Sequence, residues 1–365
     1  MVTILDLPER VAALPAERRR RFDRLFQVHR SQGELRPPPE MEGWIERHFG
    51  SVQAVRSQTI VKVTNRVTGE GALFNPLRGR RPTPSRREEP GARSSAYPPF
   101  QQPLRLTPAD PFGRVHGRHC LTASNVAKAD GFHGVLIFDE PDPLRFSREA
   151  VHDYVATALA WARRAHATDP QARYFFFLWN SHWKAGASVA HGHAQMLLGR
   201  GGHYARIEGL RRAALAYRRA HGCSYFDDLV AVHADLGLRF REGEVQGLAY
   251  LTPIKEKEVL LLAPALTEAL VDALYEVLRR FVDRLGVRAF NVALIGPPIF
   301  PGAPEDWSGF PTLFRLVDRG DPASPTTDFG AMELYAQSVI ASDPFAVARQ
   351  MGGSDGTPIG SAVHF

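Results

Sequence analysis

The segment NSHWKAGASVAHGHAQMLLGRG, residues 180–201, places two histidines and a glutamine at alternating positions behind a run of small residues. Alternate side chains of an extended strand share one face, so we expect His191, His193 and Gln195 to point the same way. Gly186 and Ser188 come just before them, in a loop that can bring backbone N–H groups close to an anion. The segment therefore predicts a strand that follows an anion-binding loop.

This arrangement suits the attack of a histidine on phosphorus, which gives a phosphoramidate. A neutral imidazole, with an ordinary pKa of about 6.5, is a capable nucleophile near neutral pH. The carboxamide of Gln195 can donate to a phosphoryl oxygen, but it is neither an acid for a leaving group nor a base for water. Two other interpretations of H-x-H stay open: a strand with two partly buried, hydrogen-bonded histidines, and a metal site with these histidines as ligands.

Composition bounds the class of protein. The chain has 365 residues, 44% of them hydrophobic, and a net charge of +6. It contains no run of about 18 uncharged apolar residues, and its Arg-rich start lacks the apolar block of a signal peptide. Cys120 and Cys223 do not form a disulfide framework, so a reducing, cytoplasmic location is expected. The basic balance permits an anionic partner, either nucleic acid or a phosphorylated small molecule.

The order of the expected elements predicts an α+β fold with a duplicated unit. Each half reads strand, helix, strand, strand, and the short connections favour antiparallel pairing. Ser147 is expected to cap the helix of the first half. The first half further predicts mostly helix over residues 1–50, a hairpin over 52–77, a loop over 78–110, and strands over 133–141, 173–180 and 191–199. The second half predicts strands over residues 246–253, 257–264, 289–296 and 310–320 and an amphipathic helix over 266–286.

We accordingly expect four segments along the chain. These are a helical extension over residues 1–50, a catalytic unit over 51–203, a second unit of the same kind over 204–350, and a tail over 351–365.

The histidine segment resembles the transferase branch of the histidine-triad superfamily, in which H-x-H-x-Q replaces the H-x-H-x-H of the hydrolases. It is most similar to the galactose-1-phosphate uridylyltransferases, with dinucleoside polyphosphate phosphorylases as relatives. That family carries an Asn six residues before a Gly, then a Ser, then H-x-H-x-Q. This chain matches the pattern without a gap at Asn180, Gly186, Ser188, His191, His193 and Gln195. The resemblance implies two tandem histidine-triad-like units, each an antiparallel sheet with packed helices.

A second stretch, NRVTGEGALFNPLRGRRP at residues 65–82, resembles the N-terminal motif of the same uridylyltransferases. The matching positions are Asn65, Thr68, Gly69, Leu73, Pro76, Arg78, Arg81 and Pro82. The resemblance implies that Arg78 and Arg81 contact substrate phosphates, which suits the forked guanidinium group. Without it, both would be interpreted as part of a solvated basic loop. GFHGVLIFDEPDP, residues 131–143, also resembles a strand of the family, and the likeness spans about residues 60–345.

The resemblance implies a role for each matched residue of the first motif. His193 would be the nucleophile, with its Nδ1–H held by the backbone carbonyl of His191 and its Nε2 free to attack the α-phosphorus. Gln195 and Ser188 would donate to phosphoryl oxygens. Asn180 and Gly186 would help to seat the nucleotide, and His191 is also expected among the substrate-binding residues.

The chain also departs from the family. Many members bind zinc through C-x-x-C, a later His and the first His of H-x-H. Here DPFG stands in place of C-x-x-C, and the position of the family's later His falls near Asp142. We therefore expect no metal and no cofactor. The family's sugar-phosphate loop, K-F-x-V-x-Y-E, is matched at Phe329 and Glu333, but Asp328 stands where a Lys would meet phosphate. The acceptor therefore stays open.

The function implied by the resemblance is ping-pong nucleotidyl transfer. A nucleoside monophosphate would move from a donor such as a UDP-hexose to a hexose 1-phosphate, in a homodimer without nucleic-acid or membrane partners. The first alternative is a dinucleoside polyphosphate or nucleotide-sugar phosphorylase. Further alternatives are a nucleotide hydrolase, disfavoured because Gln195 cannot do the acid–base work of a third histidine, and a non-catalytic nucleotide- or RNA-binding protein.

Overall fold

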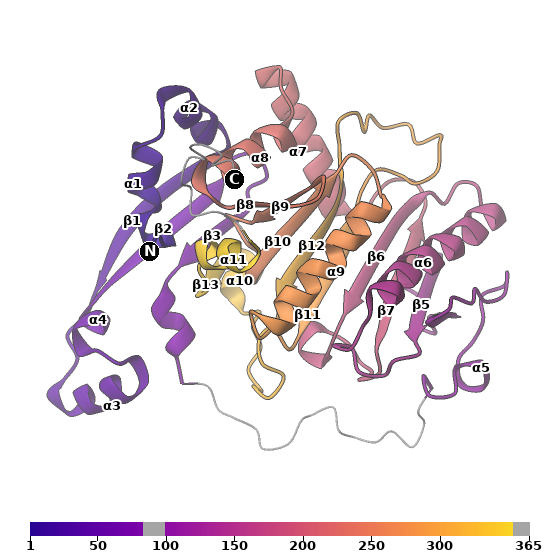
Figure 1. The fold of residues 1–365 in the computed structure, drawn as a ribbon, viewed down its shortest axis with the longest axis horizontal. Coiled ribbons are helices and arrows are strands. Elements are labelled where there is room, and N and C mark those ends of the chain that lie inside the picture. The colour runs from indigo at the N-terminus through magenta and orange to yellow at the C-terminus, as the bar shows by residue number, and fades with distance from the viewer. Residues whose placement is uncertain (83–98, 353–365) are drawn as a thin grey trace, which may run out of the picture.

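The computed structural model describes residues 1–82 and 99–352, which form two sheets flanked by helices (Figure 1). Parts of two expected segments, the loop over 78–110 and the tail over 351–365, lie outside the described residues. The first sheet contains β1 (Phe26–Glu34), β2 (Ser57–Asn65), β3 (Gly71–Phe74) and β13 (Ser338–Ile340). The second sheet contains β4 (Cys120–Ser124), β5 (Phe132–Phe138), β6 (Tyr174–Asn180), β7 (His193–Gly199), β8 (Arg239–Glu242), β9 (Val245–Ala249), β10 (Glu256–Ala263), β11 (Phe290–Ile295) and β12 (Thr312–Asp318).

The helices are distributed along the whole described chain. The α-helices are α1 (Leu7–Ala12), α2 (Ala16–Leu25), α3 (Pro39–Phe49), α4 (Val52–Arg56), α5 (Pro103–Leu106), α6 (Arg148–Thr168), α7 (Ala205–His221), α8 (Tyr225–Leu236), α9 (Glu268–Asp283), α10 (Ala331–Tyr335) and α11 (Pro344–Gln350). Short 3₁₀ turns are η1 (Ile4–Asp6), η2 (Pro76–Arg80) and η3 (Trp183–Ala185). No helix in the described ranges is long and apolar enough to cross a membrane.

The large sheet joins both halves of the chain. Its nine strands lie in the order β4-β5-β7-β6-β11-β12-β10-β9-β8, and every neighbouring pair is antiparallel. Strands β5, β6 and β7 with helix α6 are matched in the second half by β10, β11 and β12 with α9, so the strand order is mirrored about the β6–β11 pair. The predicted α+β fold of antiparallel sheets with packed helices is confirmed. The predicted segment boundaries stay a prediction.

Helix α6 follows from the sequence pattern and packs under the histidine strand. The hydroxyl of Ser147 accepts a hydrogen bond from the backbone N–H of Ala150 at 3.1 Å, as expected of an N-cap. The helix buries Trp161 against β5 at Gly134, where an added Cβ would lie 2.7 Å from the indole. Glycine at that position therefore lets the helix approach one face of the sheet closely. Figure 1 shows α6 and α9 on the same side of the sheet.

The opposite face of the sheet is covered unevenly. Over the second half, the small sheet is attached through buried polar groups. The guanidinium of Arg315 on β12 donates to Glu258 at 2.6 Å and to Glu70 at 2.7 Å, and the hydroxyl of Tyr250 donates to Glu70 at 2.6 Å. Around β6 and β7 this face retains half-buried positions, including Leu178 and Gln195.

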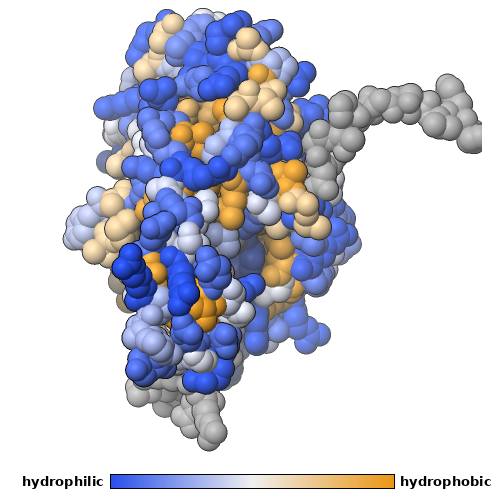
Figure 2. Space-filling model, turned by 90° about the vertical axis from the view of Figure 1, so that its left-hand side faces the viewer, coloured by the Kyte–Doolittle hydropathy of each residue, from blue (hydrophilic) through white to orange (hydrophobic). Residues whose placement is uncertain are grey.

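The N-terminal region differs in part from the expectation of a mostly helical extension. Helices α1, α2 and α3 are present, but Phe26–Glu34 is the strand β1, which pairs with β2 over its full length. Its side chains are mostly exposed, so its sequence lacks a strong apolar alternation. The hairpin of β2 and β3 was expected and is confirmed. Figure 2 shows this side of the molecule, whose surface is mostly hydrophilic with hydrophobic side chains interspersed.

Candidate active site

His193 is the first residue of β7 and is held as a neutral imidazole. Its Nδ1 donates to the backbone carbonyl of His191 at 2.8 Å, as the resemblance implied. Burial lowers the pKa of the His193 side chain, which is only 4% exposed. In the described residues Nε2 has no hydrogen-bond partner. The ring of Phe100 lies edge-on, with its centroid 5.2 Å from that of His193. The free Nε2 carries a lone pair at neutral pH.

His191 occupies a different position from the one expected. The strand begins at His193, so the alternation holds for His193 and Gln195, while His191 lies in the preceding loop. Its Nε2 donates to the carbonyl of Phe138 at 2.7 Å. Gly192, between the histidines, packs so closely against the end of β5 that a Cβ would lie 2.7 Å from the carbonyl oxygen of Glu140. His191 therefore fixes the start of β7 and presents its carbonyl to His193.

The loop before β7 offers backbone donors. Gly186 ends η3 with a φ of 95°, a conformation that favours glycine. Ser188 is exposed. In the described part of the chain, none of the backbone N–H groups of residues 188–191 donates a hydrogen bond. A run of unpaired N–H groups beside the free Nε2 of His193 is suited to an anion such as a phosphate.

Asn180 lies on the same face of the sheet as His193. Leu178 on β6 pairs with Gln195 on β7, so Asn180, two residues further on, is placed beside His193. The side-chain amide of Asn291 on β11 donates to Oδ1 of Asn180 at 2.7 Å and also to the carbonyl of Ala185 at 2.7 Å. The second contact ties β11 to the glycine loop, and the first directs the NH₂ group of Asn180 away from β11.

A chain of hydrogen bonds and ion pairs connects Asn291 to the segment that contains Phe329. Arg319 donates to Oδ1 of Asn291 at 2.6 Å and forms an ion pair with Asp328 at 2.7 Å. Despite desolvation, which acts in the opposite sense, these contacts with Arg319 lower the pKa of Asp328. The ammonium group of Lys255 lies 4.2 Å from the centroid of the Phe329 ring. Asp328, unexpected at a phosphate loop, is thus neutralised by its neighbours.

The loop also contacts this segment directly. Lys184, immediately before Ala185, donates to the backbone carbonyls of Ser324 and Thr326, and burial lowers its pKa. Glu333 accepts a hydrogen bond from the backbone N–H of Gly330 at 2.9 Å and caps α10.

Arg78 and Arg81 are not brought to His193 within one chain. Both are exposed at η2, which follows β3. This turn packs against α3 and Ala341, whereas β7 lies on the other side of the molecule (Figure 1). Their role in phosphate binding stays a prediction.

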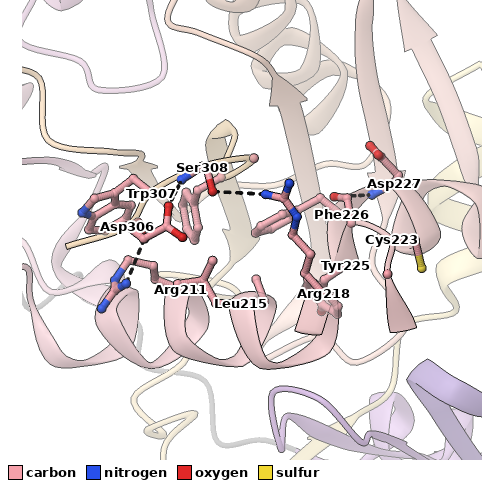
Figure 3. A pocket seen from close by; sticks show the side chains of 15 residues that line it. Arg211, Leu215, Arg218, Cys223, Tyr225, Phe226, Asp227, Asp306, Trp307 and Ser308 are labelled. Carbon is pink, nitrogen blue, oxygen red and sulfur yellow. Dashed lines mark hydrogen bonds between the residues drawn. The ribbon is translucent and has the colours of Figure 1, made fainter. Parts of the chain in front are cut away.

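A cavity of about 460 Å³ lies elsewhere, between α7, α8 and residues 306–310 (Figure 3). Its arginines are already engaged. Arg218 donates to the hydroxyl of Ser308 at 3.1 Å, and Arg211 donates to the carbonyl of Asp306 at 2.9 Å and pairs with Glu208. No histidine of residues 1–82 or 99–352 lines this cavity. Among the described residues, no group of three or more His, Cys, Asp or Glu side chains is arranged to hold a metal ion.

Comparison with known proteins bears on the fold. No protein-family model matches the chain, and no curated protein matches it in sequence. It is similar to the structure of an ADP-glucose phosphorylase from Arabidopsis thaliana with bound ADP-glucose, with a TM-score of 0.59, 16% identity and coverage of 78% of this chain and 95% of that chain. A GalT-like protein from Arabidopsis thaliana gives a TM-score of 0.57, 15% identity and coverage of 79% and 97%. A uridylyltransferase gives a TM-score of 0.55, 16% identity and coverage of 79% and 96%.

At 15–16% identity these likenesses show the fold alone, and at that level they confirm the predicted likeness to the uridylyltransferases. The sequence motif placed six residues in the first half, and the structure gathers them around the start of β7. It adds three residues that sequence reasoning missed: His133, Asn291 and Arg319. His133 lies in a stretch whose likeness to the family was noted, but nothing local marks Asn291 or Arg319.

Proposed function

We propose that the protein is a nucleotidyltransferase that works through a nucleotidyl-His193 intermediate. The observation that carries this proposal is the state of His193, a neutral imidazole with Nδ1–H fixed and Nε2 unpartnered at an open loop. In the first step Nε2 attacks the α-phosphorus of a nucleotide donor, a P–N bond forms, and the P–O bond to the leaving phosphate breaks. In the second step a phosphate oxygen of the acceptor attacks the same phosphorus and the P–N bond breaks.

The surrounding donors suit the charge that develops on the phosphoryl oxygens. Gln195 and Ser188 offer side-chain donors, and residues 188–191 offer backbone N–H groups. Asn180 and Gly186 line the same loop and are proposed to seat the nucleotide. None of these groups is a base for water, which favours transfer over hydrolysis.

We propose a UDP-hexose as the donor and a hexose 1-phosphate as the acceptor. The fold supports this choice, since a uridylyltransferase shares it. The second candidate is a phosphorylase in which inorganic phosphate is the acceptor. The neutralised Asp328 favours this candidate because it occupies the position of the expected phosphate-binding Lys, and an ADP-glucose phosphorylase also shares the fold. Phe329 and Glu333 are proposed to lie at the acceptor side.

Placement of Arg78 and Arg81 away from His193 supports a homodimer in which the arginines of one copy serve the other. Mixing Arg81→Ala chains with His193→Gly chains tests this arrangement. At low donor concentration, co-expressed mixed dimers should show up to about half the wild-type activity per dimer if the arginines act across the interface, because one of the two sites then has both groups. If the arginines act within one chain, the mixed dimers should show no more activity than the Arg81→Ala chains supply by themselves.

The function is tested by intact mass after exposure to UDP-glucose, ADP-glucose and diadenosine tetraphosphate, each with and without acceptor. The wild type should gain one nucleoside monophosphate per chain, in an acid-labile, base-stable bond, and lose it on addition of hexose 1-phosphate or inorganic phosphate. The added mass identifies the nucleotide, and the acceptor that removes it separates the two candidates. A wild type without adduct, together with full transfer by His193→Gly, would refute the covalent mechanism.

A further inference from the structure

His133 on β5 makes a hydrogen bond to the side chain of Gln195 on β7. The two strands are neighbours, with Val135 opposite Gln195 and His133 opposite Leu197, so both side chains lie on the face that contains His193. The distance between Nε2 of His133 and Oε1 of Gln195 is 2.8 Å. His133 is 5% exposed, so water does not readily replace this contact.

The surroundings of His133 determine which atom donates. The backbone N–H of Ala129 donates to Nδ1 at 3.0 Å, so Nδ1 is the acceptor and the hydrogen of the neutral ring is on Nε2. The side-chain nitrogen of Asn125 lies 3.2 Å from Nε2, but the Asn125 oxygen accepts from the N–H of Ala127, which leaves that nitrogen a donor. Oε1 of Gln195 is therefore the acceptor that faces the Nε2–H.

This contact fixes the orientation of the Gln195 amide. Oε1 of Gln195 is the acceptor of the His133 N–H, since the neighbouring nitrogen of Asn125 is a donor. If the amide turned over, the buried N–H of His133 would lose its acceptor, and a buried donor without an acceptor is costly. With Oε1 occupied, both N–H bonds of Gln195 are available to a ligand on the open face.

We propose that His133 is a positioning residue for nucleotidyl transfer, which holds Gln195 with its NH₂ group toward the transferring phosphoryl group. This inference rests on the proposed function. A transition-state donor contributes most when its direction is set beforehand, because no reorganisation is then needed during reaction. His133 itself does not touch the substrate.

The test is a double-mutant cycle on the single-turnover rate of His193 nucleotidylation, with the donor that gives the adduct. His133→Phe keeps a ring and removes the donor, and the rate constant should fall about 10-fold or more while KM changes little. Gln195→Ala should cost about 10²-fold. The double variant should be no slower than Gln195→Ala by more than about 2-fold, because His133 acts only through Gln195.

Two further variants separate positioning from packing. His133→Gln places an amide N–H near the former Nε2 and should restore the rate to within about 5-fold of wild type. His203→Phe is a matched control, since His203 is 8% exposed, lies outside the site, and should leave the rate unchanged. Additive losses in the cycle, or a His133→Phe rate equal to wild type, would overturn the proposal.

A structural measurement tests the hydrogen bond even if the proposed function is wrong or a variant does not fold. In wild-type protein without substrate, ¹⁵N NMR of the histidine rings should show His133 as the Nε2–H tautomer. The Nδ1–H tautomer would overturn the hydrogen bond whatever the activity. Absence of any adduct on the wild type would instead overturn the proposed function, and with it the catalytic consequence of His133, while the tautomer still decides on the contact.

Discussion

A buried histidine far from the site ties the stability of the fold to pH. His233 on α8 is fully buried and stacks on Tyr250. Its Nδ1 donates to the carbonyl of Leu229 at 2.8 Å, and its Nε2 accepts from the backbone N–H of Leu251 at 3.2 Å. Protonation of Nε2 would break the second bond and leave a charge in the core. Burial accordingly lowers the pKa of His233 from 6.5 to about 4.

The sign and size of the effect follow from linkage. His233 binds a proton near pH 6.5 in the unfolded chain and only near pH 4 in the folded chain. Its contribution to the free energy of unfolding therefore falls as pH drops from 6.5 to 4, and it is constant above that interval. At pH 5 the contribution of His233 amounts to a loss of about 2 kcal/mol relative to pH 7.5. His233→Gln can keep both hydrogen bonds and does not titrate, so its loss over the same interval should be about 2 kcal/mol smaller.

Urea unfolding at pH 7.5 and pH 5 measures this difference for both proteins. The change between the two pH values is compared, because His233→Gln will also alter packing at both. Equal losses in the two proteins would refute the reasoning. NMR titration of wild type provides a check that needs no variant, since the ring signals of His233 should not shift between pH 7.5 and pH 5.5.

The remaining predictions concern the site. Because burial lowers the pKa of His193, the acid limb of the single-turnover rate should have its midpoint below pH 6.5, and a midpoint at or above 6.5 would contradict a desolvated nucleophile. Gln195→His should shift the product ratio from transfer toward hydrolysis by about 10-fold, since a third imidazole can activate water, and an unchanged ratio in product analysis would argue against this role. Arg81→Ala should raise KM for the donor by about 10-fold, because a guanidinium contact to phosphate is lost. The melting temperature should not fall, because Arg81 is exposed, and unchanged kinetics would mean that Arg81 is only a solvated loop residue. Elemental analysis should find no stoichiometric zinc, and one zinc per chain that is lost in His191→Ala would disprove the expected metal-free site.

Sequence patterns predicted those elements whose own residues determine them. The cap at Ser147 is a local feature, and it is confirmed. β1 was missed because its side chains are mostly exposed, and only its pairing with β2 defines it. Helices α7 and α8 were not anticipated, although Gly222 and Gly237, each in the left-handed conformation, terminate them as a sequence-based analysis would expect.

The candidate site was predictable where it is contiguous in the chain. Asn180, His193 and Gln195 lie on two strands joined by one loop, so motif spacing found them together. His133 reaches Gln195 from 62 residues away, and Asn291 reaches Asn180 from 111 residues away. Such contacts depend on strand order and register, which motif spacing does not encode.

A residue that matches a family motif can have a structural role rather than a catalytic or binding one. Asn65 belongs to the second motif, but it is fully buried. Its Oδ1 accepts from the N–H groups of Val67 and Thr68, and its Nδ2 donates to the hydroxyl of Tyr225 at 2.8 Å. Its place in the motif is explained by the hairpin turn and by the attachment of the small sheet.

The ladder between β6 and β11 makes the two halves of the chain depend on each other. Trp179 pairs with Val292 and Phe177 with Leu294, in the middle of the sheet. If the chain were cut after residue 203, β6 would become an unprotected edge with free N–H and C=O groups beside buried aromatic side chains. Such an edge is a template for intermolecular strand addition. The second half has Thr312 at the start of β12, where β7 has His193. It thus supports the proposed nucleophile by closing the edge of its sheet.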